Sequence, residues 1–336
     1  RSSDLGEILA MVSRPTYNPN LFAGGISSKD WKLLNENPFH PMDNKAISGE
    51  YPPGSTFKII TGAAALELGK VTPEEKILDT GRHWLIPKSN AMGEALGWIS
   101  FKDALSKSDN VYFYEMGNRL GIDNLEKYAR MFGLGAVTGI NLPGESEGLV
   151  ANRQYKEKVY GEDWYLSETF DAAIGQGFQL ATPLQMAMVM SEVANGGIRY
   201  RPYLVSKILS PAGDPITVFG PQEVGRVQIS DSTINLIRSG LREVALEGGT
   251  AGYMFSDLPV TLAGKTGTAE NPHGEDHGWF VAYAPFDDPR IVVAVIVEQG
   301  GFGATSATPI VKKILEAAFN VNQPPVADSI IYRPKT

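Results

Sequence analysis

Two nearly uninterrupted apolar segments near the end of the chain restrict the possible folds most. They run from Trp279 to Ala284 and from Ile291 to Glu298, and a third strand-like segment, Val260 to Thr268, precedes them. A strand with one face in water alternates apolar and polar residues, whereas a strand buried on both faces reads as an apolar run. We therefore predict a sheet covered on both faces, with the helical segment Ile310 to Phe319 as one cover.

The middle of the chain is predominantly helical in pattern. Thr182-Pro-Leu-Gln185 is a capping box with proline at the first helical position, and Gly196-Gly197 ends that helix. Asp231 to Leu246 carries the apolar stripe of an amphipathic helix. At the other end of the chain, the apolar run Ile8 to Val12 predicts a buried strand.

Strands at both ends of a helical middle predict one α+β unit with an inserted helical part. We expect a single domain over residues 1–320, whose sheet part takes about 1–50 and 255–320 and whose mostly helical part takes about 55–250. Residues 321–336, with Pro324-Pro325, are expected to form an extended tail.

Composition excludes several classes of function. The 336 residues include 43% hydrophobic and 20% charged residues, as in an ordinary globular core. The net charge is −8 without a long basic run, which argues against nucleic-acid binding. Cysteine is absent, so disulfides, thiolate catalysis and cysteine metal sites are excluded.

Three short strings carry possible chemistry: Ser55-x-x-Lys58, Ser108-Asp-Asn110 and Lys265-Thr-Gly267. Tyr51-Pro-Pro-Gly-Ser-Thr-Phe-Lys58 leads into a run of helix formers, so Ser55 is expected at a helix start with Lys58 on the same face. A hydroxyl beside an amine at a helix start is a candidate nucleophile. One such string occurs by chance about once in a chain of this length. All three together, each occurring once and in this order, are far more specific.

With these strings the chain resembles the transpeptidase domain of class B penicillin-binding proteins, and within that family the elongation-type group, penicillin-binding protein 2. The resemblance covers nearly the whole chain. Further landmarks are Gly175-Gln-Gly177, Ala181-Thr-Pro-Leu-Gln-Met186 and Trp279-Phe-Val-Ala-Tyr-Ala-Pro285. It implies the α+β fold shared by penicillin-binding proteins and serine β-lactamases, an antiparallel sheet covered by helices plus a mostly helical subdomain.

The resemblance also implies a mechanism. Ser55 would attack the carbonyl between two D-alanines of a peptidoglycan stem peptide, expel the terminal D-alanine and become an acyl-enzyme. Lys58, if neutral, would be the base, and Ser108 would carry the proton to the leaving amine. Asn110 would bind the amide of the substrate. Penicillins imitate the D-Ala-D-Ala end and should acylate Ser55.

The third string would bind the terminal carboxylate. Lys265 would supply the charge, the hydroxyls of Thr266 and Thr268 would assist, and Gly267 would leave room for substrate along the strand. The oxyanion would be held by the backbone N–H groups of Ser55 and Thr268.

Three alternatives remain open at this stage. A β-lactamase shares the acylation step, although the Glu-x-x-Leu-Asn string of class A enzymes is absent from the sequence. A DD-carboxypeptidase uses the same residues with water as acceptor. A penicillin-sensing domain stops at the acyl-enzyme and turns nothing over.

Two clusters of polar residues suggest other sites. His273-Gly-Glu-Asp-His277 contains possible metal ligands, but we interpret it as an acidic hairpin loop, because zinc ligands usually stand on rigid elements. Asp79 and His83 suggest an acid–base pair, but the serine mechanism does not need one, so we expect them to be ordinary polar residues of a loop. We expect no metal and no cofactor.

The resemblance further implies an N-terminal membrane anchor and a pedestal domain before the present chain, which by itself is expected to be soluble. The full-length protein would be a single-pass protein of the bacterial inner membrane with its catalytic domain on the periplasmic side. Expected partners are stem peptides, β-lactams and a glycan polymerase of the elongation machinery.

Overall fold

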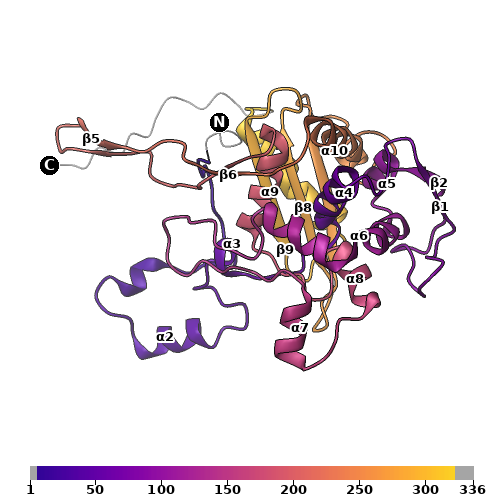
Figure 1. Cartoon of the computed structure of the whole chain (residues 1–336). Coiled ribbons are helices and arrows are strands. Elements are labelled where there is room, and N and C mark those ends of the chain that lie inside the picture. The colour runs from indigo at the N-terminus through magenta and orange to yellow at the C-terminus, as the bar shows by residue number, and fades with distance from the viewer. Residues whose placement is uncertain (1–5, 322–336) are drawn as a thin grey trace.

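The fold is α+β and is built on a three-stranded antiparallel sheet (Figure 1). The computed structural model describes residues 6–321. The sheet has the order β7-β8-β9, with β7 spanning Ala263–Ala269, β8 His277–Ala284 and β9 Ile291–Val297. The central strand pairs on both sides in full register, so that Val281 lies opposite Lys265 on one side and Ala294 on the other.

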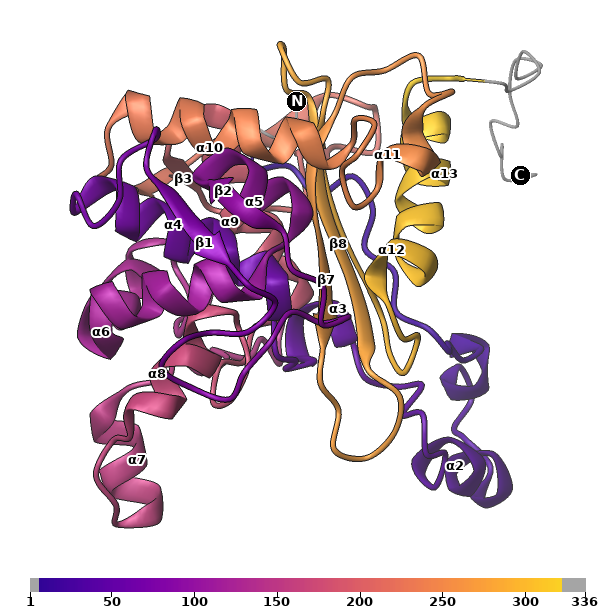
Figure 2. The same ribbon diagram turned by 90° about the vertical axis from the view of Figure 1, so that its right-hand side faces the viewer.

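Helices cover both faces of the sheet, as predicted (Figure 2). One face packs against α9 (Pro183–Asn195) and α10 (Asp231–Val244), and the other against α12 (Gly303–Ser306) and α13 (Thr308–Ala318).

The central strand β8 shows why this double cover is required. Consecutive side chains of a strand point to opposite faces. On β8, Trp279, Val281 and Tyr283 pack into the core shared with the helical part, whereas Phe280 and Ala282 pack with α13. All five are fully buried, which explains the nearly continuous apolar run from Trp279 to Ala284.

The helical part lies beside the sheet and is organised around a long helix, α6 (Asn110–Met131). It packs between α4 (Lys58–Glu67) and α8 (Leu166–Ala173). At Gly121 the backbone leaves helical geometry, with φ of 71°. The remaining elements of the described chain are η1 (Pro19–Phe22), α2 (Ser28–Asn35), α3 (Lys45–Ser48), η2 (Gly54–Phe57), β1 (Lys76–Asp79), β2 (Gly97–Ser100), α5 (Phe101–Lys107), α7 (Arg153–Tyr160), β3 (Ile198–Tyr200), β4 (Lys207–Leu209), β5 (Pro215–Val218), β6 (Glu223–Arg226) and α11 (Gly252–Phe255).

The capping box predicted at Thr182 is confirmed. The backbone N–H of Gln185 donates to Thr182 Oγ1 over 3.2 Å, and the backbone N–H of Thr182 donates to Gln185 Oε1 over 2.8 Å. Both groups are buried, so this pair satisfies two N–H groups that the start of α9 leaves unpaired inside the protein.

The strand predicted from Ile8 to Val12 is wrong. The region forms only an isolated bridge between Glu7 and Tyr203, and Leu9 and Val12 are 62% and 70% exposed. An apolar run becomes a buried strand only where a sheet edge pairs along it and other elements cover it. Here Ile8 and Met11 pack against a small cluster around Ile47 and Leu184, but within residues 6–321 no sheet strand pairs along the run. Residues 6–50 therefore add no strand to the main sheet. The predicted tail lies outside the described residues, except for Val321.

None of the helices within residues 6–321 combines the length and the apolar character that crossing a bilayer requires.

The close packing of α12 on the sheet leads to a prediction. A Cβ atom on Gly303 would lie 2.2 Å from the carbonyl oxygens of both Gly267 and Trp279. We expect Gly303→Ala to lower the free energy of unfolding by about 2 kcal/mol or more, because strand backbone must move. Denaturant titration measures this change. Gly220→Ala is the matched control, since no atom lies within 4 Å of its added Cβ. Equal stabilities of the two variants would contradict the prediction.

Candidate active site

The amine of Lys58 is the centre of the candidate site. Lys58 is the first residue of α4, and its side chain is completely buried. Its Nζ donates to the backbone oxygen of Ser108 over 2.7 Å and to Asn110 Oδ1 over 2.6 Å, and Ser108 Oγ lies 3.4 Å away. The structure thus brings the first two sequence strings together across about fifty residues of chain.

Backbone geometry turns Ser108 toward this amine. Ser108 follows the last residue of α5 and adopts a left-handed conformation, with φ of 59° and ψ of 38°. A residue other than glycine holds this conformation at a cost and keeps it where surrounding contacts impose it. Asp109 is the N-cap residue of α6, and its carboxylate accepts the backbone N–H of Tyr112 over 2.8 Å. This turn between two helices presents both Ser108 and Asn110 to Lys58.

Ser55 lies in η2, the short helical turn that leads directly into α4. The prediction of a helix start at Ser55 is therefore confirmed, with a tight 3₁₀ turn as its first part. Ser55 is half-buried, whereas Thr56 and Phe57 are fully buried. The turn is fixed by a bond from Thr56 Oγ1 to the oxygen of Pro53 (2.6 Å).

The third string lies against this turn. Lys265, Thr266 and Gly267 belong to β7, which packs on η2. A Cβ atom on Gly54 would lie 2.5 Å from the carbonyl oxygen of Thr268, and Gly54 has a positive φ of 53°. Glycine is therefore required before Ser55, because any side chain there would push the nucleophile turn off the strand. The three strings therefore come together at one candidate site.

Both lysines of the site are buried, and burial lowers the pKa of each. Burial lowers the pKa of Lys58 to about 7, against the charges of Asp109 and Glu94, which raise it. Burial, and then the charge on Lys58, hold the pKa of Lys265 well below its usual value. Lys265 Nζ donates to the oxygen of Thr266 over 3.1 Å. Near neutral pH, the site can therefore hold a neutral amine at Lys58 and use it as a base.

Sequence reasoning missed two residues that support the site. Gln176 bridges to β7, since its Nε2 donates to the oxygen of Thr268 (3.2 Å) and its Oε1 accepts the N–H of Glu270 (3.3 Å). Trp279 Nε1 donates to the oxygen of Pro52 over 3.0 Å and so ties the sheet to the turn before Ser55. Both residues lie within the family landmarks, but a string of letters does not show to which backbone groups they bond.

The prediction for Asp79 and His83 is wrong. These residues are 1% and 4% exposed, not ordinary polar residues of a surface loop. Asp79 accepts three hydrogen bonds, and His83 Nε2 lies 3.3 Å from a carboxylate oxygen of Glu115. Buried polar groups need such partners, and the sequence does not show that the loop folds inward.

The His273–His277 segment forms the turn from β7 into β8. His277 belongs to β8, and its Nδ1 accepts the backbone N–H of Gln299 over 3.0 Å. Within residues 6–321, no group of three or more His, Cys, Asp or Glu side chains is arranged to hold a metal ion.

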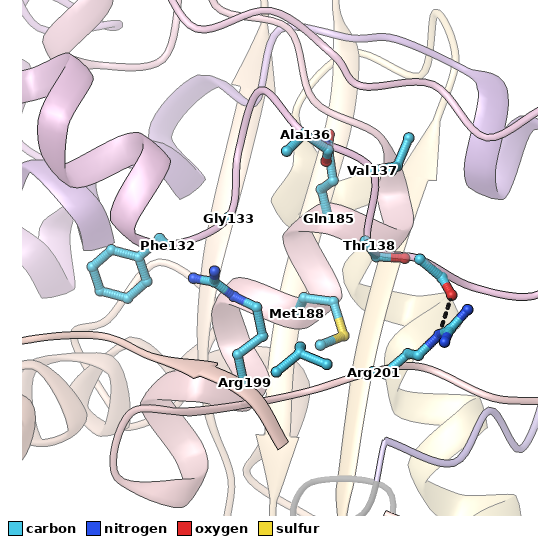
Figure 3. A pocket seen from close by; sticks show the side chains of 11 residues that line it. Phe132, Gly133, Ala136, Val137, Thr138, Gln185, Met188, Arg199 and Arg201 are labelled. Carbon is cyan, nitrogen blue, oxygen red and sulfur yellow. Dashed lines mark hydrogen bonds between the residues drawn. The ribbon is translucent and has the colours of Figure 1, made fainter. Parts of the chain in front are cut away.

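A separate cavity of about 360 Å³ lies away from this site (Figure 3). Arg199 and Arg201 extend into it beside Phe132 and Met188. The guanidinium groups are already engaged, Arg199 by Glu192 and the oxygen of Met131, and Arg201 by the oxygen of Gly139 (2.6 Å). None of the three strings contributes a residue to its wall.

The fold and the site define the class of α+β serine proteins that contains penicillin-binding proteins and serine β-lactamases. The family model described as "Penicillin binding protein transpeptidase domain" matches residues 2–316. The chain therefore belongs to the penicillin-binding protein transpeptidase family, and its relatives confirm the class B, penicillin-binding protein 2 group.

Three relatives illustrate the similarity. "Peptidoglycan D,D-transpeptidase MrdA" of Haemophilus influenzae is 33% identical, over 95% of this chain and 52% of its own length. Penicillin-binding protein A of M. tuberculosis, solved as an imipenem acyl-enzyme complex, is 32% identical with a TM-score of 0.81, covering 94% of this chain and 72% of that one. A chain of a peptidoglycan synthase complex that coordinates polymerization and crosslinking is 34% identical with a TM-score of 0.85, covering 97% and 56%. The chain spans about half the length of the curated MrdA relatives.

The buried amine of Lys58 predicts a pH-dependent stability. Its pKa is about 7 in the folded protein and 10.5 without burial, so between these values the unfolded chain binds the extra proton and stability rises with pH. Relative to Lys58→Met, which does not titrate, the unmodified protein should gain about 1.5 kcal/mol of unfolding free energy from pH 7 to 8.5. Denaturant titrations of both proteins at several pH values measure this difference. A difference independent of pH would show that Lys58 keeps an ordinary pKa.

Proposed function

We propose that this chain is the catalytic domain of a peptidoglycan DD-transpeptidase that works through an acyl-enzyme on Ser55. The observation that carries the proposal is the buried Lys58 amine, bonded to Ser108 and Asn110 at the base of the nucleophile turn, with a pKa lowered to about 7 by burial. A base poised near neutral pH is what activation of a serine hydroxyl requires.

Acylation follows from this arrangement. Neutral Lys58 accepts the proton of the Ser55 hydroxyl as Ser55 Oγ attacks the carbonyl carbon between the two D-alanines. The tetrahedral intermediate collapses, the C–N bond breaks, and the terminal D-alanine leaves with a proton. Ser108 is placed to relay that proton, because its Oγ lies 3.4 Å from Lys58 Nζ. Asn110 holds the amide of the donor peptide.

Substrate binding favours a charged Lys265 and a neutral Lys58. The terminal carboxylate of the donor favours the charged form of Lys265, and that charge lowers the pKa of Lys58 further. Thr266 and Thr268 add hydroxyl groups, and Gly267 keeps β7 free of a side chain beside the nucleophile turn, where a Cβ would lie 3.0 Å from Thr56 Cγ2. The backbone N–H groups of Ser55 and Thr268 form the oxyanion hole, supported by the close approach of Gly54 to Thr268.

Deacylation distinguishes the possible activities. In a transpeptidase an amine of a second stem peptide attacks the ester and forms the cross-link, whereas water is the acceptor in a carboxypeptidase or a β-lactamase. The relatives named peptidoglycan D,D-transpeptidase support the first of these. The imipenem acyl-enzyme complex solved for the M. tuberculosis relative supports acylation of the present chain by β-lactams, for which we propose Ser55 as the site.

The proposal extends to the setting of the longer protein. We infer a single N-terminal membrane span that holds this domain on the periplasmic side of the bacterial inner membrane. We also infer a glycan polymerase as partner, in keeping with the synthase complex that contains a similar chain.

The decisive experiment is intact-mass measurement after incubation with benzylpenicillin. We expect the unmodified protein to gain the mass of one penicillin, and we expect Ser55→Ala to gain none, because the attacking oxygen is missing. An unmodified protein without an adduct, or an equal adduct on Ser55→Ala, would refute the proposal.

Two further measurements distinguish the transpeptidase from the alternative activities. The decay of the adduct reports deacylation by water, and release within seconds would indicate a β-lactamase. Incubation with a stem-peptide donor and an amine acceptor distinguishes the rest: a cross-linked product indicates a transpeptidase, a product shortened by one D-alanine indicates a carboxypeptidase, and no turnover indicates a sensor.

A further inference from the structure

The loop between β1 and β2 contains a buried asparagine, Asn90, that none of the three strings includes. Asn90 is 4% exposed although it lies in a loop. The loop is fastened to the helical part at two further points, by His83 against Glu115 of α6 and by an ion pair of Lys88 with Asp171 of α8. This segment is therefore held firmly over the start of α6.

The side-chain amide of Asn90 uses all of its hydrogen-bonding groups. Its Oδ1 accepts the backbone N–H groups of Asn110 (2.8 Å) and Val111 (3.2 Å). Its Nδ2 donates to Asp79 Oδ2 (2.8 Å) and to the backbone oxygen of Glu94 (2.9 Å). An amide has two donor hydrogens and two acceptor positions, so these four bonds fix its orientation completely.

Asp79 anchors Asn90 from the other side. Its carboxylate is 1% exposed and accepts the backbone N–H groups of Gly81 (2.6 Å) and Leu96 (2.8 Å) in addition to Asn90. These backbone donors come from both ends of the loop, so Asp79 closes the loop and holds the Asn90 amide in place. A buried carboxyl group with three hydrogen-bond donors is a stable anchor.

The acceptors that Asn90 provides lie at the start of α6. The first N–H groups of a helix have no partner within the helix and need one from outside. Asp109 satisfies the N–H of Tyr112, and Asn90 satisfies those of Asn110 and Val111. The same Asn110 accepts the bond from Lys58 Nζ through its side chain.

We propose that Asn90 is a positioning residue for the transpeptidase reaction: it holds the Ser108–Asn110 turn at the distance from Lys58 at which that amine can act as the base. The inference rests on the proposed function. Asn90 acts through Asn110, since the described contacts connect it to the backbone of that residue and not to Lys58 itself.

The surrounding charges explain why an amide is needed at this position. Asp79 on β1, Asp109 at the start of α6, Glu94 in the same loop and Lys58 on α4 all lie in this region. Burial raises the pKa of Asp109 to about 6, and the charge of Asp79 adds to this effect. Another carboxylate in place of Asn90 would face Asp79 at hydrogen-bond distance and repel it.

The first test is the kinetics of acylation by a fluorescent penicillin. In Asn90→Ala we expect the limiting acylation rate to fall about 10- to 100-fold, because a misplaced catalytic group loses this much. The dissociation constant of the initial complex should change less, because the residues proposed to bind the carboxylate, Lys265 to Thr268, lie on β7 and not at the start of α6. Asn124→Ala is the matched control: it removes the bond from Asn124 to the oxygen of Leu120 in the same helix and should acylate normally.

Asn90→Asp gives a signature that a purely structural role would not give. At low pH the added carboxyl is protonated and can donate to Asp79 as the amide does, so acylation should approach that of the unmodified protein. As pH rises the group ionises, and acylation should decline where the unmodified protein shows no such decline. Circular dichroism at each pH verifies that the variant remains folded. A pH profile identical to that of the unmodified protein would overturn the proposal.

Hydrogen exchange separates this inference from the proposed function. The amide hydrogens of Asn110 and Val111 should exchange faster in Asn90→Ala and at the ordinary rate in Asn124→Ala, whether or not penicillin reacts. Unchanged exchange, or an unchanged acylation rate in folded Asn90→Ala, refutes the positioning role. An unmodified protein that takes no penicillin refutes the proposed function alone.

Discussion

Burial of the Lys58 amine is the constraint on which the rest of the site depends. Burying an ammonium group without a charged partner is unfavourable. Its pKa therefore falls, and the neutral amine becomes the more stable form. Here the amine donates to neutral acceptors, the backbone oxygen of Ser108 and Oδ1 of Asn110, and burial lowers its pKa to about 7 against the charges of Asp109 and Glu94. The left-handed backbone of Ser108 is part of this arrangement, because its carbonyl must point at the amine.

The sheet acts as the rigid platform for this chemistry. Layers of backbone approach one another without side chains between them: Gly175 lies against Gly54, Gly54 against Thr268, and Gly303 against Gly267. Such contacts leave little freedom for the nucleophile turn, since any shift in β7 displaces η2 as well. Reacting groups that are misplaced by about 1 Å lose much of their rate. Direct packing of backbone on backbone therefore suits an acyl-transfer site, because it holds the nucleophile turn in position.

Polar groups outside the three strings complete the site. Gln176 and Trp279 bond to backbone oxygens on the two sides of the nucleophile turn. Asn90 and Asp79 hold the start of α6 from a loop that the chain folds inward. Each of these side chains reaches a main-chain group, and main-chain groups carry no residue identity, so no residue pattern reveals these partners. For that reason the sequence suggested only loop residues at Asp79 and His83, where the structure has buried bonds.

The sequence by itself determined the fold class, the cap at Thr182, the double cover of β8 and the three strings that mark the site, because periodicity, turn chemistry and capping are local properties of the chain. It misjudged Ile8 to Val12, since whether an apolar run is buried depends on what lies against it. Only the tertiary structure decided that Lys58 has no contact with water and that Ser108, Asn110 and Lys265 surround it. The pKa of that amine is set by its burial and by the charges of Asp109 and Glu94, which are distant from it in the sequence, and the chemistry depends on this pKa.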